Sequence, residues 1–271
     1  MAFRDTLRDL QQSQQSLLCV GLDTDPAKLP GSLPRSAEGV LEFNRRIIDA
    51  TRDLVCAYKI NLAFTEVFGA ESWHLLRETL RSIPAGIITI GDGKRGDIGN
   101  TSAQYARTLR ETYGFTASTV NPYMGTDSVA PFLEDAAHGV FILALTSNPG
   151  ARDFQHLRVR SGPLYEAVVR KARRWDRLGN CGVVVGATRP RQLRRIRELA
   201  PAMPILIPGI GAQGGDLRLA VRYGCDRDGW MAIFTASRSV LYASAGEDYM
   251  SAARAAARTL RDEINALRQR R

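Results

Sequence analysis

The sequence predicts an α/β fold and, within that class, a single-domain (β/α)8 TIM barrel that spans residues 1–271. Eight short, continuous apolar runs rich in β-branched residues are typical of parallel strands that are buried on both faces. Amphipathic stretches with helical spacing lie between these runs, and no Pro/Ser-rich linker divides the chain. A doubly wound open sheet gives the same alternation, so periodicity alone leaves both architectures open.

The predicted strands follow one another along the whole chain. They cover Leu17–Asp23, Val55–Leu62, Gly86–Lys94, Ala117–Pro122, Val140–Ser147, Cys181–Thr188, Pro204–Ile210 and Met231–Ser239. The clearest predicted helices cover Val40–Leu54, Leu164–Leu178, Pro190–Ala200 and Asp248–Arg271. For the third of these helices we expect Thr188 to be the N-cap and Pro190 to lie in the first turn, where a missing N–H costs nothing.

The chain is basic, with 37 Lys and Arg residues against 28 Asp and Glu residues and a net charge of +9. Such a balance suits polyanions or phosphorylated ligands. Only four of the basic residues are lysines, however, and Arg191, Arg194, Arg195 and Arg197 lie along one predicted helix. We interpret these arginines as a solvated helix face. Because no groove-reading motif is present, we expect no nucleic-acid partner.

Several other classes of protein are excluded by pattern. The four cysteines form no CxxC pair and the three histidines form no HExxH motif, so we expect free buried thiols and no metal site. The apolar runs are well short of the ~18 residues that span a bilayer. The N-terminus is polar and carries no apolar signal segment. The sequence therefore predicts a cytoplasmic protein with no membrane partner.

Polar residues stand where the predicted strands end. In a barrel, the carboxyl ends of the strands form the face that carries chemistry. These positions hold Asp23, Lys59, Asp92, Lys94, Asn121, Ser147, Thr188 and Arg238. Their convergence predicts a functional site at that end of the barrel.

The densest cluster of charge lies in the segment GDGKRGDIGNT. Asp92 and Lys94 are expected on the same side of an extended strand, and Lys59 on the neighbouring strand is within reach of Asp92. Asp97 follows the glycine turn and completes an alternating chain of charges. A structural ion pair or a helix cap is the alternative. A lysine can transfer a proton whereas arginine cannot, so Lys59 and Lys94 favour the catalytic interpretation.

A glycine-rich segment, PGIGAQGGD, covers Pro208–Asp216 between the seventh predicted strand and a helix. Glycines at such a point let backbone N–H groups approach an anion. Gly209, Gly211 and Gly214 also fit GxGxxG, but no acidic residue ends the next strand, which disfavours a dinucleotide site. Barrels commonly bind phosphate between the loops after strands seven and eight, where Arg238 would supply a cationic fork.

In this order, the motifs resemble the orotidine 5′-phosphate decarboxylase family, and in particular its longer bacterial subgroup. The resemblance covers nearly the whole chain and rests on GLDTDP, AYKIN, DGKRGDIGNT, VNPYMGTDS, LTSNPG, VVGATRP, PGIGAQGGD and ASRS. It implies the conversion of orotidine 5′-phosphate to UMP and CO2 without a metal or cofactor. One departure is Gly93, where alanine is more usual in the family.

The resemblance also implies roles for individual residues. Lys94 would stabilise and protonate the C6 carbanion, with Asp92 beside the scissile carboxylate and Lys59 paired with Asp23. Asp97 and Thr101 would come from the partner subunit, which makes the protein a homodimer. The substrate-binding set would be Asp23 for the ribose, Thr101, Ser147 for the pyrimidine ring, and Gln213, Gly214 and Arg238 around the phosphate.

Two other functions remain open at this point. A metal-dependent sugar-phosphate decarboxylase or synthase of the same superfamily would carry an acidic metal ligand where this chain has Lys59. A non-catalytic barrel that binds a phosphorylated ligand would bind a nucleotide without turnover.

Overall fold

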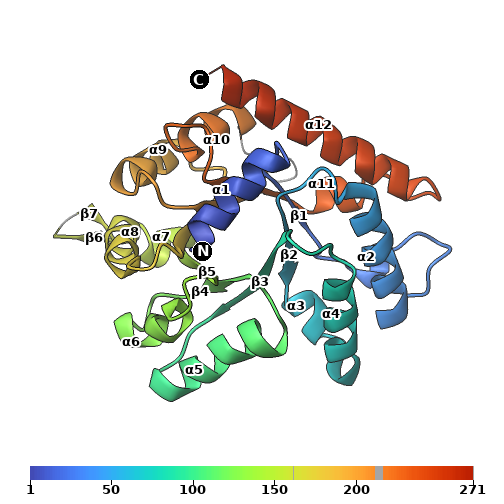
Figure 1. The fold of residues 1–271 in the computed structure, drawn as a ribbon, viewed down its shortest axis with the longest axis horizontal. Helices are drawn as coiled ribbons and strands as arrows, with labels where there is room; N and C mark the ends of the chain where they lie inside the picture. Colours follow the sequence, from blue (N-terminus) through green and yellow to red (C-terminus); the bar gives the residue numbers. More distant parts are fainter. Residues whose placement is uncertain (161, 211–215, 271) are drawn as a thin grey trace.

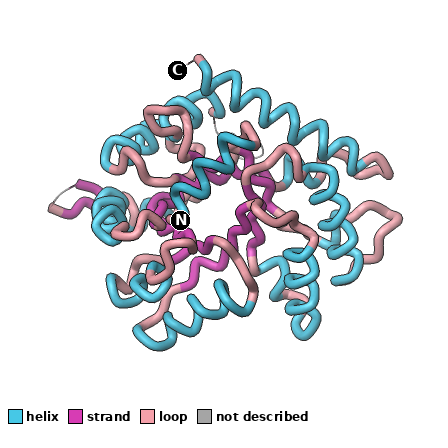
Figure 2. Tube along the Cα trace, viewed as in Figure 1, coloured by secondary structure: helices cyan, strands magenta, loops and turns pink. Residues whose placement is uncertain are grey.

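The computed structural model describes residues 1–160, 162–210 and 216–270, and its centre is a closed barrel of eight parallel strands (Figures 1 and 2). The barrel strands are β1 (Leu18–Gly21), β2 (Ala57–Asn61), β3 (Ile88–Arg95), β4 (Ala117–Val120), β5 (Gly139–Leu145), β8 (Cys181–Val185), β9 (Ile205–Pro208) and β10 (Ala232–Ala236). All eight predicted strands are confirmed. Because β1 pairs with both β2 and β10, the ring closes, and the open-sheet alternative is excluded.

Helices surround the barrel and connect its strands (Figure 2). The longer ones are α1 (Phe3–Ser13), α2 (Ala37–Thr51), α4 (Ser72–Arg81), α5 (Gly99–Arg107), α8 (Leu164–Trp175), α9 (Pro190–Leu199), α10 (Leu217–Gly224) and α12 (Tyr249–Gln269). Short turns of helix are η1 (Pro26–Lys28), α3 (Ala63–Glu66), η2 (Gly69–Glu71), η3 (Thr108–Thr112), α6 (Thr126–Val129), η4 (Ala130–Leu133), α7 (Ala151–Phe154) and α11 (Arg238–Leu241). A separate antiparallel pair, β6 (Arg158–Val159) and β7 (Gly162–Pro163), precedes α8.

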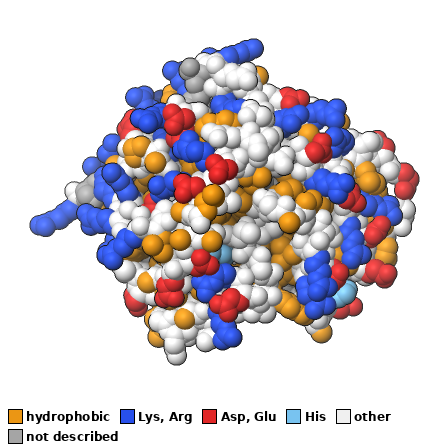
Figure 3. All heavy atoms as spheres, in the orientation of Figure 1, with side chains coloured by type: hydrophobic (Ala, Val, Ile, Leu, Met, Phe, Trp, Pro, Cys, Tyr) orange, Lys and Arg blue, Asp and Glu red, His pale blue; other side chains and the backbone are white. Residues whose placement is uncertain are grey.

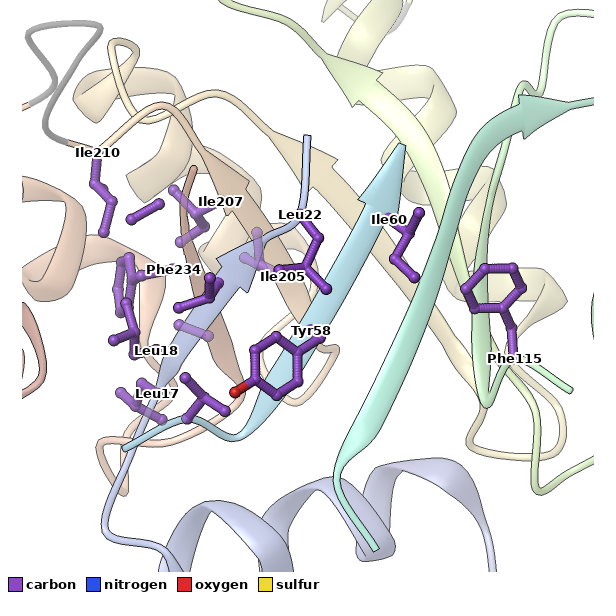
Figure 4. Packing of buried hydrophobic residues seen from close by; sticks show 14 of the residues in the cluster. Leu17, Leu18, Leu22, Tyr58, Ile60, Phe115, Ile205, Ile207, Ile210 and Phe234 are labelled. Atoms are coloured by element: carbon purple, nitrogen blue, oxygen red, sulfur yellow. The ribbon is translucent and has the colours of Figure 1, made fainter. Parts of the chain in front are cut away.

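Strand alternation divides the apolar side chains into two layers. The outer layer packs between strands and helices, and Figure 4 shows part of it around Leu18, Tyr58 and Phe234. The inner layer fills the barrel and includes Phe141. Helix α1 lies across the amino-terminal end of the barrel (Figure 1), where Phe3 meets Phe141 edge to face at 5.9 Å between ring centroids. The amino-terminal end is therefore closed, which leaves the carboxyl end for a site.

The predicted helices are present, but their ends differ from the prediction. Helix α2 begins at Ala37 rather than Val40, because the Ser36 hydroxyl accepts a hydrogen bond from the Gly39 N–H and caps the first turn. The prediction that Thr188 caps α9 is wrong. The N-cap is Arg189, without a side-chain cap, while Pro190 does occupy the first turn.

The arginines of α9 do not all face solvent. Arg191, Arg194 and Arg195 are exposed, as expected, and Figure 3 shows basic side chains spread over the face in view. Arg197 differs: its guanidinium donates hydrogen bonds to backbone carbonyls that include those of Met203, Gly224 and Met231. Its guanidinium therefore joins the end of α10 to the segments that precede β9 and β10, rather than facing solvent. No helix among the described residues has the length and apolar character needed to cross a membrane.

Candidate active site

Two adjoining cavities open at the carboxyl ends of the strands. The first has a volume of about 440 Å³ and is lined by residues that include Asp23, Lys59, Asp92, Lys94 and Arg238. The second has a volume of about 430 Å³ and is lined by residues that include Ser147 and Thr188. The two share Lys94, Val184 and Pro208, so together they form one continuous depression. The predicted convergence of strand-end residues is confirmed, apart from Asn121, which instead caps its own turn through the Tyr123 N–H.

The charged residues form a connected network on the floor of the first cavity. The Lys59 ammonium lies 3.0 Å from Asp23 Oδ1 and 3.2 Å from Asp92 Oδ2. The other oxygen of Asp92, Oδ1, accepts a hydrogen bond of 2.7 Å from Lys94 Nζ. The predicted contacts of Asp92 with Lys59 and Lys94 are therefore confirmed. Lys59 also forms an ion pair with Asp23. One set of ion pairs therefore links β2, β3 and the residues that follow β1.

The network favours the charged forms of Asp92 and Lys59. Burial on its own would raise the pKa of Asp92, but Lys59 and Lys94, together with hydrogen bonds, lower it to about 2. Burial likewise opposes the charged form of Lys59, yet Asp23 and Asp92 outweigh it and raise the pKa of this ammonium. At neutral pH the cavity floor thus holds a fixed carboxylate beside Lys94, whose side chain is 42% exposed and faces the cavity.

A bulge in β3 brings Asp92 and Lys94 to the same side. Gly91 pairs with Ser118 and Arg95 pairs with Val120, so the register of β3 against β4 shifts between them. Lys94 has a φ of 45°, in the left-handed region that non-glycine residues rarely adopt. The prediction that these side chains share a side was right, but an irregular backbone produces the arrangement rather than regular strand alternation.

Two hydroxyls that the sequence analysis missed support the network. Thr119 on β4 donates a hydrogen bond of 2.8 Å to Asp92 Oδ1. Ser237, which follows β10, donates one of 2.8 Å to Asp23 Oδ2. Strand alternation could have predicted that both side chains face the barrel interior. Thr119 lies two residues after the buried, inward-facing Ala117, and Ser237 lies two residues after the buried, inward-facing Thr235.

Asp97 and Thr101 lie apart from this network within the chain. The Asp97 carboxylate accepts a hydrogen bond of 2.7 Å from the N–H of Ile98, just before α5. Thr101 is exposed in the first turn of α5. Among the described residues that line the two cavities, neither is present. Within this chain, the alternating series of charges therefore ends at Lys94.

The opposite side of the depression carries polar groups with few partners. Arg238 begins α11, is exposed, and forms no ion pair with the described part of the chain. The Ser147 hydroxyl is buried and makes no hydrogen bond to any described residue. Gly209 and Ile210 line the first cavity next to Arg238. The predicted phosphate-binding residues Gln213 and Gly214 fall outside the described residues.

A catalytic metal has no evident ligand set here. Within the described ranges, no group of three or more His, Cys, Asp and Glu side chains is placed to hold a metal ion. Two of the cavity carboxylates, Asp23 and Asp92, instead share the Lys59 ammonium. All four cysteines are buried, and none of them forms a disulfide within the described residues.

A family model, curated relatives and solved structures match this chain over nearly all of its length. A family model described as "Orotidine 5'-phosphate decarboxylase / HUMPS family" matches residues 16–258. Curated relatives named orotidine 5′-phosphate decarboxylase include one from Dehalococcoides mccartyi, 47% identical over 100% of both chains, and one from Roseiflexus castenholzii, 50% identical over 98% of both. The solved structure of Leishmania donovani OMP decarboxylase has a TM-score of 0.87, 41% identity and 99% coverage of both chains.

Proposed function

The chain belongs to the orotidine 5′-phosphate decarboxylase / HUMPS family and is a carboxy-lyase of pyrimidine synthesis, and from this premise we propose that it converts orotidine 5′-phosphate to UMP and CO2 with its own side chains alone. One observation carries the proposal. The ion-pair network of Lys59, Asp92 and Lys94 lies on the floor of a cavity whose far side offers a free arginine. An ammonium held by a carboxylate is the group that this chemistry needs.

Loss of CO2 from C6 leaves an electron pair in the plane of the ring, where no π-system delocalises it. The reaction therefore requires a nearby positive charge and a proton donor. In our proposal Lys94 supplies both. The C6–carboxylate bond breaks, the electron pair stays on C6, and a proton moves from Lys94 Nζ to C6. Lys94 then regains a proton from solvent, which its 42% exposed side chain allows.

Asp92 has a different part in the proposed reaction. Its pKa of about 2 keeps it anionic, and it holds Lys94 at 2.7 Å. A substrate carboxylate bound beside it would meet like charge, which is relieved when CO2 leaves. Lys59 keeps Asp92 and Asp23 in place, and Asp23 is positioned to accept a hydrogen bond from a ribose hydroxyl.

The far side of the depression would hold the rest of the nucleotide. Arg238 suits the phosphate dianion, and we assign Gln213 and Gly214 to the same group on the resemblance alone. The unpartnered Ser147 hydroxyl suits a polar edge of the pyrimidine ring. Binding energy from the remote phosphate can then be used to lower the barrier at C6.

We further propose that the protein is a homodimer whose partner subunit supplies Asp97 and Thr101. Both residues lie near the rim on α5 and its approach, but outside their own cavity. The loops after β3, β4 and β5 also expose large apolar side chains, namely Ile98, Tyr123, Met124 and Phe154, which are 48% to 79% exposed. A second copy seated on this rim would cover them and bring Asp97 to Lys94.

Mixed dimers test this arrangement. Lys94→Ala and Asp97→Ala chains are each expected to be inactive alone. After subunit exchange, a statistical mixture should recover up to about a quarter of the wild-type activity, because each hybrid has one intact site. Sedimentation should give a dimer. No recovery after verified exchange would place Asp97 in the site of its own subunit.

The decisive experiment for the reaction is the change in ultraviolet absorbance when the purified protein meets orotidine 5′-phosphate in EDTA. Rapid formation of UMP is the expected result. Binding of UMP without any conversion would favour a phosphate-binding barrel with another substrate, to be sought among sugar phosphates with metal restored. The sequence also predicts that residues 1–271 act as one domain in the cytoplasm, and cysteines that form no disulfide are compatible with a reducing compartment.

A further inference from the structure

The bulge in β3 leaves one residue of β4 facing three residues of β3. Gly91 pairs with Ser118 and Arg95 with Val120, so Asp92, Gly93 and Lys94 all stand opposite Thr119. An expanded strand of this kind loses ladder hydrogen bonds, and the freed groups need other partners. Thr119 is buried, at 1% exposure, and its hydroxyl lies in the middle of the gap.

The two hydrogen bonds of Thr119 have only one possible direction. The Lys94 N–H must donate, so the Thr119 hydroxyl oxygen accepts that bond at 2.9 Å. Asp92 is ionised and can only accept, so the Thr119 O–H points to Asp92 Oδ1 at 2.8 Å. One hydroxyl thereby connects the backbone of Lys94 to the carboxylate that holds the ammonium of the same residue.

We propose that Thr119 is the positioning residue that holds Asp92 and Lys94 in their reactive geometry. The proposal rests on the proposed function, in which Lys94 protonates C6. Without the hydroxyl, the Lys94 N–H loses its hydrogen-bond acceptor. The strained backbone conformation of Lys94, with a φ of 45°, is then less stabilised. Asp92 loses one of the three groups that hold it against a substrate of like charge.

Substitution of Thr119 by residues of similar size separates the hydroxyl from packing. Thr119→Val keeps the shape but removes both hydrogen bonds, whereas Thr119→Ser keeps them. We expect kcat to fall about 10- to 100-fold in the valine variant, the effect of losing a hydrogen bond to a charged group. We expect KM to stay within about threefold, because the phosphate side is untouched. The serine variant should retain most of kcat.

The pH dependence gives a readout that a purely structural role would not move. Asp92 must be ionised, so the loss of a donor should raise its pKa and shift the acid limb of kcat to higher pH in Thr119→Val. In Thr119→Ser the limb should stay in place. If the valine variant does not fold, Thr119→Ala carries the same expectation for both kcat and the acid limb.

A neighbouring hydroxyl provides the matched control. Ser118 is also buried on β4, but its hydroxyl lies 3.0 Å from His138 Nε2, on the outer side of the strand. Ser118→Ala should change stability while leaving kcat and its acid limb unchanged. A valine variant with wild-type kcat and an unmoved limb would overturn the proposal, as would a serine variant as impaired as the valine variant.

The role of Thr119 can also be tested without turnover. Carbon-13 NMR titration of Asp92 should give a pKa near 2 in the wild-type protein and a higher pKa in Thr119→Val. An unchanged pKa in the variant would overturn the hydrogen-bonding role. The pKa of Asp92 could be higher in Thr119→Val while the wild-type protein does not decarboxylate orotidine 5′-phosphate. That result would contradict the proposed function but support the hydrogen-bonding role of Thr119.

Discussion

The two sides of the active-site depression are built differently. On the β1 to β4 side, each carboxylate oxygen of Asp23 and Asp92 already has a partner in the protein. On the β5 and β10 side, the Ser147 hydroxyl and the Arg238 guanidinium have none among the described residues. The charges that we propose to act on C6 are thus already held in place by other groups of the protein. The groups that we propose to bind the rest of the nucleotide have no partner among the described residues.

This contrast predicts that substitutions on the two sides fail in different ways. Lys94→Ala should lower kcat by at least about 10⁴-fold, because it removes both the proposed proton donor and the proposed positive charge beside C6. The affinity for UMP should change little, since UMP has no carboxylate at C6 and is held from the other side. Steady-state kinetics and calorimetric titration with UMP measure the two effects.

Lys171→Ala is the control for Lys94→Ala. Lys171 lies on α8, with its ammonium over the ring of Trp175. It carries the same charge far along the chain from the network, so its loss should leave kcat unchanged. A Lys94→Ala variant that retained a tenth of the wild-type rate would assign the proton to another group.

On the other side, Arg238→Ala should lower kcat/KM on the order of 10²- to 10³-fold. This factor corresponds to a loss of several kcal/mol of transition-state stabilisation. The reaction of orotidine, which lacks the phosphate, should be unaffected by the same substitution. Arg191→Ala, at an exposed position on α9, controls for loss of charge. A loss below about tenfold with the phosphorylated substrate would argue against a phosphate contact.

Much of this contrast could be predicted from the sequence, and the remainder depends on tertiary register. Continuous apolar runs and polar strand ends predicted all eight strands and the contacts of Asp92 with Lys59 and Lys94. Thr119 was missed because, in a strand, threonine looks like any other β-branched residue. Alternation predicts an inward-facing side chain here, but the two hydrogen bonds of Thr119 depend on the bulge opposite it, which local sequence does not specify. Arg197 was misinterpreted because two of its carbonyl partners, Gly224 and Met231, lie far from it in the sequence.

The preassembled side should also make stability depend on acid. The folded-state pKa of Asp92 is about 2, below its ordinary value of 3.8. Its contribution to stability is therefore complete above pH 3.8 and is lost as the pH falls to about 2, an effect of about 2 kcal/mol. Chemical denaturation of the wild-type protein and Asp92→Asn across this range measures the difference. If the free energy of unfolding changed equally with pH in the two proteins, the carboxylate of Asp92 would not be stabilised by the network.

Two serines compare the sides in the ligand-free protein. Ser237→Ala removes a hydrogen bond to a carboxylate and should lower the free energy of unfolding by about 1–2 kcal/mol. Ser147→Ala removes a hydroxyl that has no partner among the described residues, so stability should be unchanged or slightly higher. Its cost should appear instead as weaker UMP binding, of about tenfold. Denaturant unfolding and UMP titration of both variants measure these effects. The comparison would be contradicted if Ser147→Ala lowered stability and Ser237→Ala weakened only UMP binding.

The smallest effect is expected within the bulge itself, at Gly93. A Cβ at this position would lie 2.9 Å from Leu62 Cδ1, the end of that side chain, and 3.1 Å from Nε of the long, flexible Arg95 side chain. Alanine also restricts the unfolded chain, a gain of about 0.4–1 kcal/mol that offsets the adjustment of Leu62. Gly93→Ala should therefore change stability by less than about 1 kcal/mol and leave kcat within about threefold.

Gly91 provides the contrasting substitution two residues earlier on the same strand. There a Cβ would lie 2.8 Å from the ring of Phe115, a buried side chain that cannot move aside. Gly91→Ala should destabilise the protein by about 1–3 kcal/mol. If Gly93→Ala proved equally damaging, the bulge would be rigid on both faces. The geometry of Asp92 and Lys94 would then depend on the shape of the β3 backbone as much as on the Thr119 hydroxyl opposite it.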